Sequence, residues 1–209
     1  RRRRLMPFLW NVISTRGQLW GNRSYGNKMN VANDYAFSYP GYNEIFTGDT
    51  DPAVSSNEKY NNPNVNVLEY LDGKPGFRGK IAVFSSWDVF PYILNTDRND
   101  LPVNSGYQPA VDNDLSAAQT LFNKVQEEAI DHTSATRQDM LTFLAAKEYA
   151  VKNRPRILYL ALGETDEAAH HERYDEYLQK ANQADRMIAE LWNFVQTTPG
   201  YKDHTTFLI

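Results

Sequence analysis

The fold class follows from two stretches of the sequence, Lys80-Ile-Ala-Val-Phe-Ser85 and Arg156-Ile-Leu-Tyr-Leu-Ala-Leu162. Each is a short, uninterrupted apolar run, which is typical of a β-strand buried on both faces. Between them, apolar residues at helical spacing predict helices at 115–130 and 137–152. Strands separated by helices need crossover connections, and such connections produce parallel sheets. We therefore predict an α/β fold, with a mostly parallel sheet and helices on both faces.

Further elements are expected before the first of these strands. Apolar residues at helical spacing predict a helix at 6–14, which Gly17 would end. Residues 18–24 predict a short strand, and an Asn-, Gly- and Tyr-rich loop follows. Residues 40–46 predict a short helix, because proline is tolerated in a first helical turn.

The C-terminal residues Thr205-Thr-Phe-Leu-Ile209 begin a third apolar run, which we interpret as the start of another strand. Because this run has no polar tail, we expect the sequence to be a fragment. We interpret residues 1–209 as one α/β domain that is incomplete at both ends. Within it, residues 95–114 are predicted as a long connection, and residues 95–152 as a helical cap or insertion.

The composition excludes several classes of protein. The chain has 209 residues, with 22 Lys and Arg against 26 Asp and Glu, and it is 41% hydrophobic and 13% aromatic. This composition excludes a disordered polar chain. We expect no membrane span, because no apolar run approaches the roughly 20 residues that one needs. We expect no nucleic-acid partner, because there is no long basic stripe. The absence of cysteine excludes disulfide scaffolds and thiolate metal sites. Cellular compartment and oligomeric state stay open.

Asp166 and His170 form the first candidate site, directly after the second strand. Residues four apart lie on one face of a helix, so the carboxylate and the imidazole can meet at one metal ion. The alternative is an acidic residue that the helix dipole favours, next to solvent-exposed histidines. Ligands of open α/β sheets collect beyond the carboxyl ends of the strands, and this position favours the metal interpretation.

Ser38 forms the second candidate site, because it directly precedes the helix predicted at 40–46. Free backbone N–H groups and the helix dipole would favour an anion there, either an alkoxide or a phosphate. The alternative is ordinary helix capping by serine. The sequence contains no Ser-His-Asp arrangement at informative spacing and no glycine-rich phosphate-binding motif.

Together, the two segments resemble the alkaline phosphatase superfamily, in its phosphodiesterase and phosphoglyceromutase-like branch. That branch has a Ser or Thr nucleophile followed by x-Pro and then a Thr-Gly ending, as in Ser38-Tyr39-Pro40 and Thr47-Gly48. Its Glu-Pro-Asp-x-x-Gly-His motif is similar to Glu164-Thr-Asp-Glu-Ala-Ala-His170. Tyr42 stands where sulfatases have arginine, which argues against sulfatase activity. Similar proteins are found in bacteria.

The resemblance implies a metal-dependent hydrolase or transferase of small-molecule phosphate esters, which acts through a phosphoserine. It implies two divalent metal ions, most often zinc, with manganese or calcium in some branches. Ser38 would be the nucleophile and one metal ligand, and Asp166 and His170 would be further ligands. The remaining ligands would lie outside this sequence, so we expect the 209-residue chain alone to be inactive. Asn43 is assigned to a phosphoryl oxygen, although the polarity of a helix surface explains it nearly as well.

A different interpretation treats the chain as a non-catalytic binding module. Its aromatic-rich loops, with Trp20, Tyr25, Tyr35 and Tyr42, would then recognise a glycan or a peptide. A module of this kind needs no metal, whereas the enzyme requires one.

Overall fold

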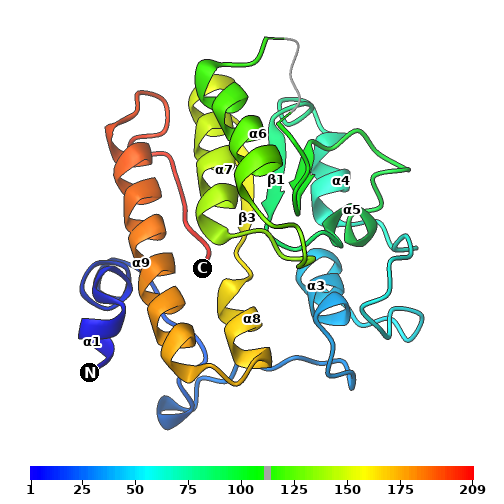
Figure 1. The fold of residues 1–209 in the computed structure, drawn as a ribbon. Helices are drawn as coiled ribbons and strands as arrows, with labels where there is room; N and C mark the ends of the chain where they lie inside the picture. Colours follow the sequence, from blue (N-terminus) through cyan, green and yellow to red (C-terminus); the bar gives the residue numbers. More distant parts are fainter. Residues whose placement is uncertain (111–113) are drawn as a thin grey trace. The chain divides into compact units, whose positions relative to one another are not determined.

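The computed structural model describes residues 1–110 and 114–209 (Figure 1). The chain, predicted as one domain over 1–209, divides into two compact units. Unit 1 consists of Arg1–Lys28 and Glu164–Ile209, and unit 2 of Met29–Gly163. Each unit is described by itself.

A three-stranded parallel sheet forms the centre of unit 2. Its strands are β1 (Ile81–Ser85), β2 (Val103–Ser105) and β3 (Ile157–Ala161), and their order is β2-β1-β3. Both pairings are parallel, and Val83 aligns with Val103 on one side and with Tyr159 on the other. All five residues of β1 are buried, as the apolar run predicted for a central strand. The predicted parallel α/β fold is confirmed.

Helices cover both faces of this sheet, because successive strand residues point to opposite sides. Ile81 and Val83 belong to one core cluster, to which α3 (Ser38–Thr47), α4 (Val67–Asp72) and α5 (Phe90–Ile93) contribute. Ala82 and Phe84 face the other way, toward Ala146 and Tyr149 of α7 (Asp139–Asn153). The helix α6 (Ala117–Ala129) contacts α7 (Figure 1). The helices predicted at 40–46, 115–130 and 137–152 are confirmed.

The segment predicted as a cap, 95–152, contributes to the sheet itself. It provides β2, inside the stretch predicted as a connection, and α7, which packs on β1 and β3. The strand β2 escaped prediction because it has three residues and only Val103 is apolar. An edge strand this short gives no apolar run to detect.

Unit 1 is built around two helices, α8 (Glu164–His170) and α9 (Tyr174–Thr197). The N-terminal segment forms α1 (Arg2–Leu5), a π-helical turn η1 (Leu9–Ile13) and α2 (Ser14–Arg16), and α1 contacts α9. The helix predicted at 6–14 is thus largely confirmed, and it ends at Gly17.

A buried carboxylate attaches the N-terminal segment to α9. Asp185 is 1% exposed, and its two oxygens accept the N–H groups of Phe8 and Leu9, each at 2.8 Å. A third bond runs from the Asn182 amide to the Leu5 carbonyl at 2.7 Å. These bonds satisfy N–H groups that a helix start leaves free, which is why an acidic residue is tolerated in the interior.

Two strands predicted in unit 1 are wrong. Residues 18–22 are irregular and lead into the 3₁₀ turn η2 (Arg23–Tyr25), and residues 205–209 form no strand. Phe207 packs its ring on Trp192, with 5.3 Å between the centroids, whereas Leu208 is 94% exposed. A strand needs a neighbouring strand for its backbone hydrogen bonds, and neither segment has one among the described residues.

Gly163, the last residue of unit 2, packs closely against the end of β1. A Cβ atom at this position would lie 2.7 Å from Thr136 Cγ2 and 3.4 Å from Ser86 Cβ. We predict that Gly163→Ala lowers the free energy of unfolding by about 1–3 kcal/mol, because the added methyl group overpacks this contact. Urea unfolding followed by circular dichroism measures the change. Adding Thr136→Ser, which removes the clashing methyl group, should recover part of the loss; a Gly163→Ala variant as stable as the parent contradicts this packing.

Candidate functional site

The structure brings Asp166 and His170 together on α8. His170 Nε2 lies 3.3 Å from Asp166 Oδ2, and both side chains are largely exposed. This pairing confirms the prediction that the two side chains share a helix face. Neighbouring bonds hold the helix: Glu164 accepts Lys180 Nζ of α9 at 2.6 Å, and His171 is turned to the Glu167 carbonyl through Nδ1 at 2.8 Å.

The geometry of this pair suits a metal ion. Two ligand atoms that each lie about 2 Å from a tetrahedral metal are about 3.3 Å apart, so the pair needs little rearrangement to chelate one. The same contact is also an ion pair when the histidine is protonated. Within residues 1–110 and 114–209, no group of three or more His, Asp or Glu side chains could hold a metal. Within the described residues, the pair could supply at most two ligands to a metal ion.

Ser38 begins α3 rather than preceding it, so the alternative of helix capping by Ser38 is wrong. Phe37, with extended backbone angles, occupies the capping position, and its own side chain makes no capping bond. The Ser38 hydroxyl has no hydrogen-bond partner among the described residues. Ser38 is thus a half-buried residue at the N-terminus of α3, and its hydroxyl makes no bond to the rest of the described structure.

The first turn of α3 offers an anion fewer backbone donors than expected. Pro40 has no N–H group, and the Tyr39 N–H donates to Asn57 Oδ1 at 2.9 Å. Only Ser38 contributes a free amide among these first three positions. Of the free N–H groups predicted from the sequence at this helix start, one is therefore missing and one is bonded within the protein.

Asn57 is a site residue that the sequence did not reveal. Because its Oδ1 accepts the Tyr39 N–H, its Nδ2 donors point away from that bond, on an exposed side chain beside the start of α3. The contact joins residues 18 apart in the sequence, so no local pattern announces it. A side-chain amide that keeps its N–H donors for a ligand can bind an oxyanion.

Asn43 is 1% exposed and is part of a buried polar network. Its Nδ2 donates to the Asp49 carbonyl at 3.1 Å, and its Oδ1 accepts Asn62 and Asn64 at 3.0 and 3.2 Å. These bonds tie α3 to the loops that follow it. The contact with substrate predicted for Asn43 stays a prediction.

Glu44 holds the loop that leads to Ser38. Its carboxylate accepts the backbone N–H groups of Ala32 at 2.9 Å and Asn33 at 2.6 Å, and also the Asn33 side-chain amide. These donors, above all the Ala32 N–H, lower the pKa of Glu44. The Glu44 carboxylate of α3 thus holds the loop that precedes Ser38.

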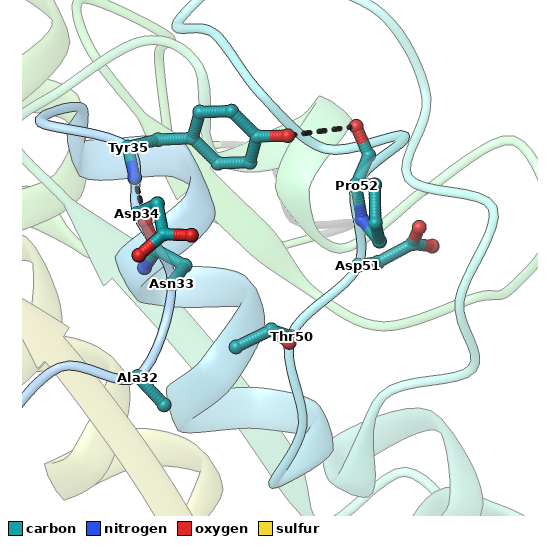
Figure 2. A pocket seen from close by; sticks show the side chains of 7 residues that line it. All are labelled: Ala32, Asn33, Asp34, Tyr35, Thr50, Asp51 and Pro52. Carbon is teal, nitrogen blue, oxygen red and sulfur yellow. Dashed lines mark hydrogen bonds between the residues drawn. The ribbon is translucent and has the colours of Figure 1, made fainter.

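A small hollow opens between this loop and the segment after α3 (Figure 2). Its volume is about 230 Å³. The Tyr35 hydroxyl, on one side of the hollow, donates to the Pro52 carbonyl on the other at 3.4 Å. The lining residues are Ala32, Asn33, Asp34, Tyr35, Thr50, Asp51 and Pro52. Asp51 is occupied by the Ala53 N–H and the Asn64 amide.

The four aromatic residues considered for a binding module have different environments. Trp20 and Tyr25 are 66% and 85% exposed, and Tyr35 lines the hollow. Tyr42 instead packs against Phe90, with ring centroids 4.8 Å apart. Tyr42 therefore packs against the hydrophobic core.

Ser38 belongs to unit 2, whereas Asp166 and His170 belong to unit 1. The surroundings of Ser38 and of the Asp166–His170 pair are therefore each described within one unit. Comparisons with known protein families, with curated proteins and with solved structures find no match for this chain. None of the helices in the described part of the chain has the length and apolar character of a membrane span.

The pKa of Glu44 gives a prediction about acid stability. A carboxyl group whose pKa is lower in the folded state stabilises the fold above its usual value of 4.5, and loses that effect as the pH falls through the folded value. We predict that Glu44→Gln lowers the urea midpoint at pH 7, and that its difference from the parent shrinks below pH 4.5. Glu58→Gln, on an exposed loop, is the control. A Glu44→Gln difference that is independent of pH contradicts the anchoring role of this carboxylate.

Proposed function

We propose that this protein is a metal-dependent hydrolase or transferase of phosphate esters, with Ser38 as its nucleophile and Asp166 and His170 as metal ligands. The contact between Asp166 and His170 is the observation that carries the proposal, because its 3.3 Å separation suits a shared metal ion. The unpaired Ser38 hydroxyl supports it. So does the resemblance of both segments to motifs of the alkaline phosphatase superfamily.

In the proposed reaction, Ser38 Oγ attacks the phosphorus of the ester. The bond from Ser38 Oγ to phosphorus forms as the bond to the ester oxygen breaks, and the alcohol leaves with a proton. Water, or a second hydroxyl group, then attacks the phosphoserine and releases phosphate or a new ester. Divalent metal ions, when bound, stabilise the attacking and leaving oxygens. The exposed Nδ2 of Asn57 would donate to a phosphoryl oxygen during both steps.

The nucleophile is tested by comparing Ser38→Ala with Ser56→Ala in the protein expressed from its complete gene. The substrates are an aryl phosphate and a bis-aryl phosphate, each assayed with and without a chelator. We expect turnover that the chelator abolishes and that Ser38→Ala lowers by at least about a thousandfold, because a covalent step loses its only nucleophile. Ser56→Ala should behave like the parent. Unchanged turnover in Ser38→Ala removes the nucleophile assignment.

The metal ligands are tested by equilibrium dialysis with zinc. We expect Asp166→Ala and His170→Ala each to lower zinc affinity by at least about tenfold, since even residues that only support a ligand commonly cost that much. The adjacent His171→Ala is the matched control, because the His171 ring is bonded to the Glu167 carbonyl and should not bind the metal. Parental zinc affinity in all three variants contradicts the ligand assignment. Turnover that persists without any metal would favour a different chemistry.

A further inference from the structure

Tyr39 follows the proposed nucleophile directly and is fully buried. Its ring stacks on Tyr60, with 5.1 Å between the centroids, and it belongs to the core cluster beneath α3. The chain therefore passes within one residue from a hydroxyl at the surface to a side chain in the core. The placement of Ser38 depends on how firmly its neighbour is held.

The Tyr39 hydroxyl lies between two backbone carbonyl groups. It is 2.8 Å from the Tyr60 oxygen and 3.0 Å from the Tyr92 oxygen, so that its single hydrogen is shared between them. Tyr60 belongs to the loop that carries Asn57, and Tyr92 belongs to α5, which follows the end of β1. Burial strongly raises the pKa of Tyr39, so the hydroxyl stays a proton donor at physiological pH.

Tyr39 is thus held at both ends. Its backbone N–H donates to Asn57 Oδ1 at 2.9 Å, and its hydroxyl reaches the carbonyl groups on the far side of the ring. Two attachment points separated by the length of a tyrosine side chain restrict both the position and the tilt of the first turn of α3. The side chain of Ser38 itself contributes no bond to this arrangement.

We propose that Tyr39 is a positioning residue for Ser38, and that its hydroxyl fixes the start of α3 so that Ser38 Oγ is aimed at the substrate phosphorus. This inference rests on the proposed function. A nucleophile displaced by about 1 Å can lose about a hundredfold in rate, so a hydroxyl that touches no substrate can still control turnover.

The test compares Tyr39→Phe with Tyr60→Phe in the protein expressed from its complete gene. Both variants remove one hydroxyl from the same stacked pair, and within residues 1–110 and 114–209 the Tyr60 hydroxyl bonds only to the 53–55 segment. We expect Tyr39→Phe to lower kcat for an aryl phosphate by about tenfold to a hundredfold while KM stays within about twofold. Tyr60→Phe should leave both constants within about twofold. A merely structural role would lower thermal stability in both variants without this split.

A parental kcat in Tyr39→Phe, or an equal loss in Tyr60→Phe, overturns the inference. Ser38→Ala in the same assay separates the two proposals, because unchanged turnover there means that the proposed function fails. Amide hydrogen exchange at position 39, whose N–H donates to Asn57 Oδ1, and at Gly41 gives a measurement that needs no turnover. In Tyr39→Phe, but not in Tyr60→Phe, these amides should exchange faster than in the parent. Unchanged exchange in Tyr39→Phe overturns the positioning role.

Discussion

The burial of β1 is the constraint on which the rest of unit 2 depends. Every residue of this strand is buried, and its side chains alternate between two apolar layers. Helices α3, α4 and α5 can pack on one side and α7 on the other only because the strand presents Ile81 and Val83 to one layer and Ala82 and Phe84 to the opposite layer. The start of α3, and hence Ser38, is placed by this packing.

Beyond the end of β1 the apolar core gives way to a buried polar network. Ser86 Oγ donates to Asp139 Oδ1 at 2.6 Å, and the same oxygen accepts the Gly163 N–H at 2.7 Å. Thr142 Oγ1 lies 2.8 Å from Ser86 Oγ and accepts Arg137 Nε at 3.0 Å. Asp139 thereby joins Ser86, the residue after β1, to Gly163, two residues after β3. These bonds compensate for the burial of a carboxylate.

Arg137 shows how much this network depends on neutral partners. The side chain is fully buried, and it donates to side-chain amides, a hydroxyl and backbone carbonyls, including the amide oxygens of Asn104 at 2.8 Å and Gln126 at 3.2 Å. Burial lowers the pKa of Arg137 to about 10. The Arg137 guanidinium therefore stays charged at neutral pH. Its hydrogen bonds connect α6, α7 and the loop after β2.

Local patterns predicted the parts of the structure that depend on local physics. The apolar runs at 80–85 and 156–162 specify strands because burial on both faces demands such runs. The spacing of Asp166 and His170 specifies a shared helix face. Long-range contacts were not predictable: β2 becomes a strand only because β1 lies beside it, and Asn57 meets Tyr39 through the fold. The segment 205–209 shows the converse, since an apolar run without a neighbouring strand remains irregular.

The proposed function requires Ser38, from unit 2, and the Asp166–His170 pair, from unit 1, to act on one substrate. The chain has no cysteine, so introduced thiol groups would be the only ones present. The most direct measurement is the rate of intramolecular crosslinking by a short bifunctional thiol reagent in Ser38→Cys/His170→Cys, compared with Ser38→Cys/His204→Cys. If the proposed function holds, crosslinking should be rapid in the first variant and slow in the second. Equal rates in the two variants, or rapid crosslinking only to position 204, would contradict it.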